Sequence, residues 1–72
     1  MTVEWTLVDS SNVAAIGYEK EAEDLHVQFN SGSVYVYSNV PVEVFDNFKD
    51  ADSKGRYLNE NIKGVYDYIR IS

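Results

Sequence analysis

Two tyrosines separated by one residue are the side chains that most directly suggest a binding surface in this sequence. Tyr35 and Tyr37 flank Val36 in a run of strand-forming residues, so both rings are expected on one face of a β-strand. Neighbouring rings on a sheet can stack on the bases of single-stranded nucleic acid. A domain this small also needs such rings as half-buried core. Taken alone, the pair favours the core interpretation.

A basic and aromatic segment later in the chain supplies further candidate ligand-binding groups. Its lysine and arginine side chains would hold phosphates by charge, and its tyrosine would contact a base. The structural alternative is that the tyrosine packs, the asparagine satisfies backbone groups and the basic side chains are solvated. Together with the tyrosine pair, these candidates are Lys54, Arg56, Tyr57, Asn59 and Lys63.

An acidic stretch between two predicted strands is the candidate surface for docking another protein. It lacks the Asp-x-Asp-x-Asp-Gly pattern and the final glutamate of a calcium-binding loop, so we expect no metal there. The alternative is a solvated hairpin tip that keeps the domain soluble. The candidate docking residues are Glu19, Glu21, Glu23 and Asp24.

The sequence offers little to a catalytic mechanism. His26 is the single histidine, and the chain has no cysteine. No nucleophile elbow, phosphate loop or dinucleotide fingerprint is present, and a single histidine makes a poor metal site. We therefore expect no catalytic residue, no metal and no cofactor, and we expect the chain not to be an enzyme. His26 lies on the polar side of its strand and is predicted to be exposed.

Length and charge limit the domain organisation and the partners. Seventy-two residues form one domain, here spanning positions 1–72, and the net charge is -6. Long-range attraction to a nucleic acid is therefore disfavoured. Residues 1–47 hold eight acidic side chains and one base, whereas residues 48–72 hold five bases and four acids. Because no signal peptide or membrane span is recognisable, we expect a soluble, cytoplasmic protein with no membrane partner.

Period-2 alternation predicts several strands. Val3, Trp5 and Leu7 alternate with polar residues, as in a half-buried strand. A second extended stretch follows at residues 13–18, in which Gly17 indicates a bulge or a close backbone approach. The clearest strand covers residues 25–30. It is joined to the strand at residues 34–37 by a turn in which Gly32 supplies a positive φ.

One helix and a short final segment complete the predicted elements. Pro41 suits the first turn of a helix, and apolar residues at helical spacing continue to Ala51. Gly55 is predicted to end this helix as a left-handed cap. Residues 56–59 then resemble an extended segment, Asn59 is expected to cap a brief helix, and residues 68–71 are predicted to form a terminal strand.

The predicted class is therefore α+β. We expect a small antiparallel sheet of three or more strands, arranged as a β-hairpin meander and packed against one helix of about ten residues. A short C-terminal helical or extended segment follows the helix.

The order of these landmarks resembles the KTSC domain family. The resemblance rests on Ser10-Ser11-Asn12-Val13, Ile16-Gly17-Tyr18, Leu25-x-Val27-x-Phe29-x-x-Gly32, Tyr35-x-Tyr37, Val40-Pro41, Ala51-x-Ser53-x-Gly55-x-Tyr57-Leu58-Asn59, Ile62 and Tyr66. It covers residues 8–66 in one collinear order. The family is named for a domain at the C-terminus of some lysyl-tRNA synthetases, and it also occurs as small stand-alone proteins.

The KTSC family has no established activity, so the resemblance by itself implies little about function. An RNA-binding role is suggested by the attachment of the family's domain to a tRNA synthetase. We therefore predict a small non-catalytic module that binds RNA or single-stranded nucleic acid. The alternative is an acidic protein–protein interaction module, an adaptor or an inhibitor of another protein.

Overall fold

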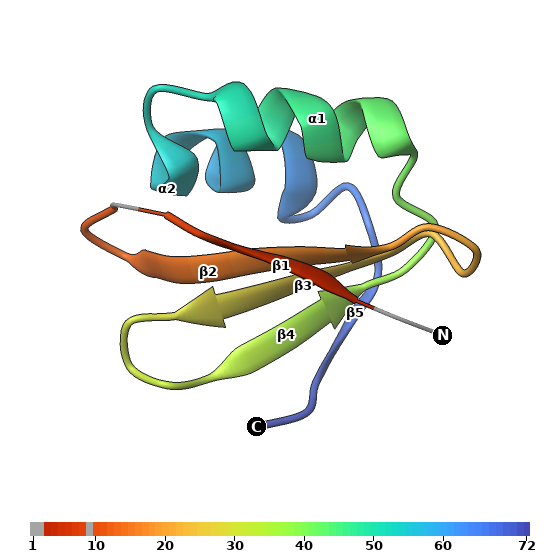
Figure 1. Ribbon diagram of the computed structural model, residues 1–72, viewed down its shortest axis with the longest axis horizontal. Helices are drawn as coiled ribbons and strands as arrows, with labels where there is room; N and C mark the ends of the chain where they lie inside the picture. The colour runs from red at the N-terminus through yellow and green to blue at the C-terminus, as the bar shows by residue number, and fades with distance from the viewer. Residues whose placement is uncertain (1–2, 9) are drawn as a thin grey trace.

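A five-stranded antiparallel sheet carries all of the helical segments on one of its faces (Figure 1). The computed structural model describes residues 3–8 and 10–72. The predicted α+β class is confirmed. The strands are β1 (Glu4–Leu7), β2 (Val13–Glu19), β3 (Asp24–Phe29), β4 (Val34–Tyr37) and β5 (Tyr68–Arg70). The helical segments are α1 (Val42–Asp50), α2 (Lys54–Tyr57) and a π-helical turn, η1 (Leu58–Ile62).

The strand order β1-β2-β3-β4-β5 follows the sequence, with each neighbouring pair antiparallel. This meander places the β1–β2 and β3–β4 connections at one end of the sheet and the β2–β3 hairpin at the other end (Figure 1). Gly32 has a φ of 98° in the β3–β4 turn, which confirms its predicted role. β5 returns after the helices to pair with β4, and this confirms the predicted terminal strand.

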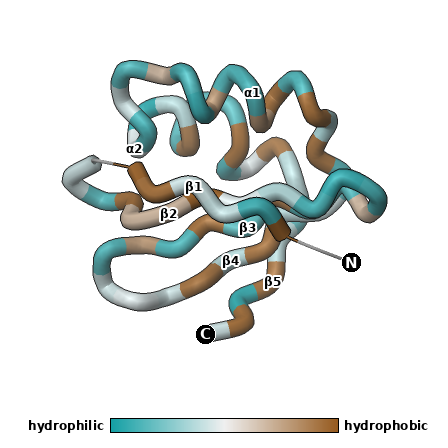
Figure 2. The backbone as a smooth tube through the Cα atoms, in the orientation of Figure 1, coloured by the Kyte–Doolittle hydropathy of each residue, from teal (hydrophilic) through white to brown (hydrophobic). Residues whose placement is uncertain are grey.

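The core lies between the sheet and the helices. Residues of β2, β3 and β4 form the buried cluster together with residues of α1 and η1, and Figure 2 shows that apolar positions recur along these strands. The polar residues gather at the β2–β3 hairpin and on the outer turns of α1. The buried cluster consists of Val13, Ile16, Tyr18, Leu25, Val27, Tyr37, Val40, Phe45, Phe48, Leu58 and Ile62.

The helix α1 begins and ends close to its predicted limits. Pro41 occupies the N-cap position, and its carbonyl accepts a hydrogen bond from the backbone N–H of Val44 at 3.0 Å. Phe45 and Phe48 are buried from this helix against the sheet. Ala51 leaves the helical conformation with a ψ of 138°, so the helix ends there rather than at the predicted glycine.

The expectation for residues 55–59 is wrong. Gly55 lies inside α2 and is not a left-handed cap, and residues 56–59 are helical instead of extended. Ser53 is the residue that caps α2, because its hydroxyl accepts a hydrogen bond from the backbone N–H of Arg56 at 3.3 Å. Asn59 lies within η1, so it does not cap the helix. Burial of Leu58 and Ile62 stabilises a segment whose local sequence is a weak helix former.

The outer face of the sheet differs from expectation in two places. β1 forms as predicted, but its side chains are exposed rather than half-buried: Trp5 is 47% exposed and Leu7 is 87% exposed. His26 is half-buried instead of exposed, because Trp5 lies edge-on to its ring at 5.7 Å. Gly17 is a site of close approach, since a Cβ there would lie 2.6 Å from Cγ1 of Val3. The bulge in β2 falls between Val13 and Ala15.

Candidate binding cavity

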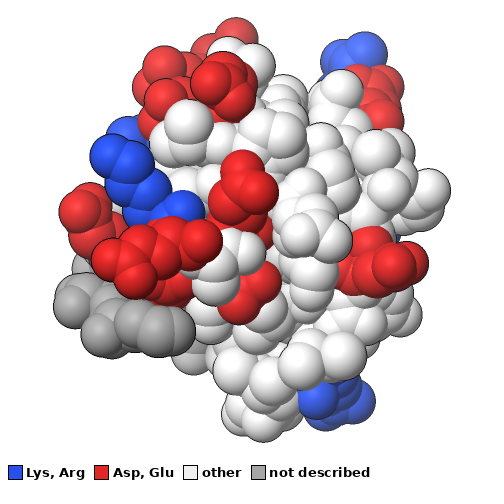
Figure 3. All heavy atoms as spheres, turned by 90° about the vertical axis from the view of Figure 1, so that its right-hand side faces the viewer, with Lys and Arg blue, Asp and Glu red and all other residues white. Residues whose placement is uncertain are grey.

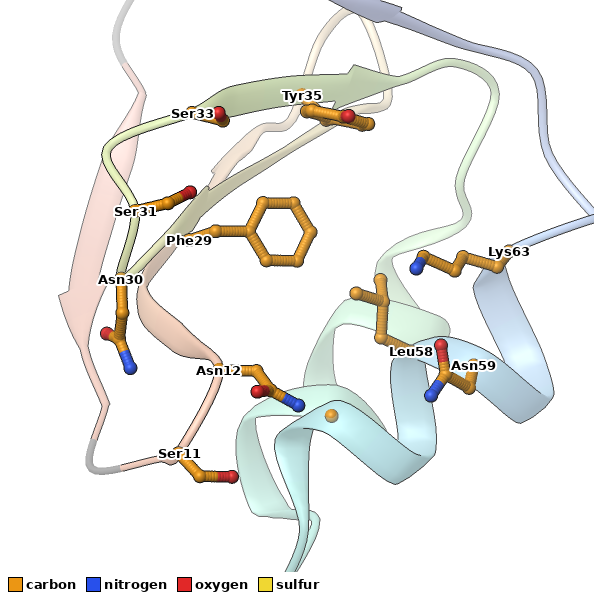
Figure 4. A pocket seen from close by; sticks show the side chains of 11 residues that line it. Ser11, Asn12, Phe29, Asn30, Ser31, Ser33, Tyr35, Leu58, Asn59 and Lys63 are labelled. Carbon is orange, nitrogen blue, oxygen red and sulfur yellow. The ribbon is translucent and has the colours of Figure 1, made fainter.

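A cavity of about 440 Å³ opens at the end of the sheet where the β1–β2 and β3–β4 connections meet the helical segment α2–η1 (Figure 4). This volume falls within the roughly 300–1,000 Å³ range of small-ligand pockets. Three stretches of the chain, distant in sequence, contribute its lining: residues 11–12, 29–35 and 55–63. The lining residues are Ser11, Asn12, Phe29, Asn30, Ser31, Ser33, Tyr35, Gly55, Leu58, Asn59 and Lys63.

Backbone hydrogen bonds hold the two connecting loops together at the cavity rim. The N–H of Asn30 donates to the carbonyl of Asn12 at 2.8 Å, and the Asn30 amide donates to the carbonyl of Ser10 at 3.1 Å. The hydroxyl of Ser10 in turn accepts from the N–H of Asn12 at 3.3 Å. These bonds fix the backbone of Asn12, which leaves its side chain to face the cavity.

Three polar side chains of the cavity retain unused hydrogen-bonding capacity. Among the described residues, none lies within hydrogen-bond distance of the side-chain amides of Asn12 and Asn59 or of the Lys63 amine. Figure 4 shows Asn12 reaching toward the helical segment and Lys63 reaching back toward Leu58. An Asn amide offers two donors and an acceptor, and a lysine offers three donors. These groups can therefore bind a polar ligand without breaking an existing bond.

Two aromatic rings form the apolar wall of the cavity. Phe29 and Tyr35 pack edge to face, with ring centroids 5.3 Å apart and planes at 78°. Tyr35 also stacks on Tyr68 at 5.1 Å and 11°, so one of its faces is already occupied. A flat ligand would consequently pack against this wall beside the free amides. The π-helical turn η1 supplies Asn59 to the opposite side, and such turns are frequent at functional sites.

The cavity brings together Tyr35, Asn59 and Lys63 from the residues that the sequence singled out. Tyr37 lies in the core with 1% of its surface exposed, so its ring has no free face for a ligand. Burial, followed by the neighbouring tyrosines Tyr68 and Tyr35, raises the pKa of Tyr37 above its ordinary value. The two rings of β4 therefore have different environments despite sharing one face.

Three other candidates are engaged in bonds that hold the helical segment. The amine of Lys54 donates to the carbonyl of Ala51, and Arg56 forms an exposed ion pair with Glu60 at 3.4 Å. Tyr57 stacks on Phe48 at 5.5 Å, and its hydroxyl donates to the carbonyl of Val44 at 3.3 Å. None of the three lines the cavity. Tyr57 thus fastens α2 to α1.

The candidate docking residues lie at the opposite end of the molecule, on the β2–β3 hairpin (Figure 1). Glu21 and Glu23 are exposed, and Asp24 is half-buried. Glu19 is buried, and its carboxylate accepts a hydrogen bond from the N–H of Ala22, so it is not available for docking. Figure 3 shows acidic side chains gathered over this end of the molecule.

The environment of the Tyr18 hydroxyl includes several carboxylates of this end of the molecule. The hydroxyl donates to the carbonyl of Val40 at 2.6 Å in a buried position. Burial is the main reason why the pKa of Tyr18 is raised, and the nearby carboxylates of Glu23, Glu43, Asp46 and Glu19 add to the effect in that order. Side chains from the hairpin and from α1 therefore form one acidic end.

The polar side chains that line the cavity are amides, hydroxyls and one amine. The described lining contains no carboxylate, imidazole or thiol, and Lys63 is the one charged residue in it. Within residues 3–8 and 10–72 no group of His, Cys, Asp and Glu could hold a metal ion. In the same part of the chain no helix has the length and apolar character needed to cross a bilayer.

A family model for the KTSC domain matches residues 9–66 of this sequence. The chain belongs to the KTSC family. A crystal structure of a KTSC domain protein from Yersinia pestis superposes with a TM-score of 0.94 at 34% identity, covering 99% of this chain and 100% of that chain. The five-stranded α+β fold is thus shared with a solved member of the family.

KTSC relatives occur both as small proteins and within larger ones. A protein from Stutzerimonas stutzeri, described as uncharacterised, is 42% identical over 65 residues, which is 89% of this chain and 92% of that protein. A lysine–tRNA ligase from Nostoc punctiforme is 36% identical over 64 residues. This chain spans only 11% of the ligase's length, and the matching family model points to no class of enzyme.

Most of the cavity was missed from the sequence, although much of it lies within the KTSC resemblance. The residues of that resemblance that line the cavity are Ser11, Asn12, Phe29, Tyr35, Gly55, Leu58 and Asn59. The polar residues of the β1–β2 and β3–β4 connections could have indicated the cavity, because alternate turns of an antiparallel meander lie at the same end of the sheet. The asparagines and serines of the first and third turns could thus have been placed together.

Proposed function

We propose that this KTSC chain is a non-catalytic module that binds single-stranded nucleic acid, RNA in the first place, by holding one nucleotide in the cavity. The observation that carries this proposal is the convergence of unpaired amides and one amine beside an aromatic wall. Asn12, Asn59 and Lys63 provide the polar groups, and Phe29 and Tyr35 provide the rings. The site operates in the cytoplasm.

The parts of a nucleotide match the parts of the cavity. An unpaired base has a flat apolar ring and a polar edge, and proteins recognise it by ring contacts and hydrogen bonds to that edge. The rings of Phe29 and Tyr35 would contact the base, and the amides of Asn12 and Asn59 would meet its edge. Lys63 would then bond a phosphate oxygen. Inside a duplex each base is stacked on both faces and cannot place its ring against this aromatic wall, so the ligand is single-stranded.

The charge distribution makes the interaction local and weakly dependent on salt. A net charge of -6 repels a nucleic acid at long range, but the β2–β3 hairpin with its acidic residues lies at the other end of the sheet from the loops that line the cavity (Figure 1). One lysine contacts one phosphate. For single strands each such contact contributes a slope of about -0.7 to log K against log salt concentration. We therefore expect a slope of about -0.7 or shallower, because salt also screens the repulsion.

Fluorescence anisotropy with a labelled, mixed-sequence RNA of about ten nucleotides tests the proposal. Lys63→Gln should weaken binding by about tenfold or more, since a hydrogen bond to a charged group, worth about 1.5–3 kcal/mol, is lost. It should also flatten the salt dependence. Lys20→Gln is the matched control: it removes the same charge from the exposed β2–β3 hairpin and should leave affinity unchanged within about twofold. Equal effects of the two variants, or no binding at low salt, would refute the proposed function.

A second candidate function rests on the acidic end. Glu21 and Glu23 are exposed, Glu23 and the α1 carboxylates Glu43 and Asp46 all act on Tyr18, and a dense anionic end can dock on a basic protein surface. Under this alternative, a partner recovered with the wild-type chain should be released by the double substitution Glu21→Lys and Glu23→Lys. Unchanged retention of that partner by the double variant would eliminate acidic docking.

A further inference from the structure

Gly55 stands at a helical position where its backbone does not require glycine. It belongs to α2, and its φ lies outside the left-handed region, which in this chain is occupied by two other glycines, Gly32 and Gly64. Alanine is ordinarily more favourable than glycine inside a helix. The reason for a glycine must therefore be sought in what surrounds it.

The space that a side chain at Gly55 would occupy is taken by Asn12. A Cβ at this position would lie 3.0 Å from the side-chain nitrogen of Asn12, which is closer than an ordinary van der Waals contact. No other residue comes so near, since the next atoms, at 3.9 Å, also belong to Asn12. The bare backbone of α2 thus allows the amide of Asn12 to lie against the helical segment at the cavity wall.

Asn12 is also the best-positioned of the unpaired polar groups. Its backbone is held by the N–H of Asn30 at 2.8 Å and by the Ser10 hydroxyl, so its Cα is fixed relative to both loops. Its amide has the Gly55 backbone on one side and the cavity on the other (Figure 4). The backbone of Asn12 is thus held, its side chain lies against α2, and its amide remains free to bond a ligand in the cavity.

We propose that the amide of Asn12, positioned by the absence of a side chain at Gly55, is the specificity-determining contact of the cavity, and that it selects an adenine base. This inference rests on the proposed function. An Asn amide pairs through two parallel hydrogen bonds with the adjacent N6 donor and N7 acceptor of adenine. Lys63 would contact the phosphate, and such a contact does not distinguish one base from another.

The contact is tested by measuring the affinities of the full chain for oligo(A), oligo(C), oligo(U) and an abasic oligonucleotide of the same length. Oligo(A) should bind best, and the abasic strand should bind at least about tenfold more weakly. Asn12→Ala should reduce the affinity for oligo(A) by about three- to tenfold, as expected for a lost hydrogen bond. Asn61→Ala is the control, because it removes an exposed amide of η1 that does not line the cavity.

Gly55→Ala gives the sharper result because it should keep or raise the stability of the fold while it lowers the preference for oligo(A). The melting temperature should be unchanged or a few degrees higher, since alanine favours the helix and the exposed Asn12 amide can turn away. The preference for oligo(A) should fall to within about twofold of the other bases. If this variant does not fold, Asn12→Asp carries the same test: its carboxylate accepts but cannot donate, which should shift the preference from oligo(A) toward oligo(C).

The possible failures are distinguishable. No binding of any oligonucleotide by the wild-type chain would overturn the proposed function itself. Wild-type binding that is equal for all bases, or unchanged by Asn12→Ala and Gly55→Ala, would overturn the role of Asn12 and leave the proposed function standing.

Discussion

The two tyrosines of β4 should respond very differently to truncation, although they share one face of the sheet. Tyr37 is 1% exposed and packs within the core, next to Tyr68 at 5.4 Å. Truncating a buried aromatic residue to alanine costs about 3–5 kcal/mol. A domain of 72 residues has a total stability of about 4–11 kcal/mol. Tyr37→Ala should therefore lose a large part of the domain's stability, and it should be unfolded if the wild-type stability lies near the lower end of this range.

Tyr35 is half-buried at the cavity and should tolerate the same change. Its aromatic pairs with Phe29 and Tyr68 are each worth about 0.5–1.5 kcal/mol beyond burial, so Tyr35→Ala should cost about 1–3 kcal/mol. The variant should stay folded. Because it loses part of the aromatic wall, its affinity for single-stranded RNA should fall.

Urea denaturation followed by circular dichroism measures both costs, and anisotropy measures binding by each folded variant. Tyr37→Phe is the control for shape. No described residue accepts a hydrogen bond from the buried hydroxyl of Tyr37, so its removal should leave the free energy of unfolding unchanged or raise it. Equal costs for the two alanine variants, or a loss above about 1 kcal/mol for Tyr37→Phe, would refute this assignment of the two rings.

Two further predictions concern the scaffold. Burial raises the pKa of Tyr18 and of Tyr37 above 10.0, so the unfolded chain loses these protons at a lower pH than the folded chain does. The free energy of unfolding should therefore be constant below pH 10 and fall as the pH rises through the raised pKa values. Tyr18→Phe should reduce this fall in urea titrations at alkaline pH. If stability stays constant through the alkaline range, the burial argument fails. Gly17→Ala should cost about 1–3 kcal/mol and speed amide exchange in β1, because its Cβ would clash with Val3 and Trp5; a neutral result would contradict the close approach.

The strands and the long helix were predictable because each has a local pattern. The alternation through Leu25, Val27 and Phe29 and the turn at Gly32 specify the central hairpin without tertiary information. Pro41 and the spacing of the apolar residues that follow it specify α1 in the same way. In these elements the burial pattern repeats with the period of the backbone.

The segment α2–η1 was not predictable from local pattern. Gly55 resembles a helix terminator, and the helical conformation depends on contacts that are distant in sequence. Leu58 and Ile62 enter the core, and Tyr57 packs on Phe48 of α1. The residue nearest to Gly55 across the fold is Asn12, which is far away in the sequence, so local pattern could not reveal this contact.

The candidate site was predicted only in part for the same reason. Tyr35, Asn59 and Lys63 were singled out by residue type, and they line the cavity. Tyr37 was grouped with Tyr35 by spacing, but spacing specifies a face of the sheet and not the depth of burial. The loop residues contributed by the first and third turns required the fold itself.

The most direct test of the central claim is the ¹⁵N–¹H spectrum of the side-chain amides during titration with a single-stranded RNA at low salt. We expect the signals of Asn12 and Asn59 to shift together and saturably, while that of Asn61, on the same helical segment outside the cavity, does not move. Unchanged side-chain signals for Asn12 and Asn59, with or without shifts of backbone amides in the β2–β3 hairpin, would contradict the proposed site.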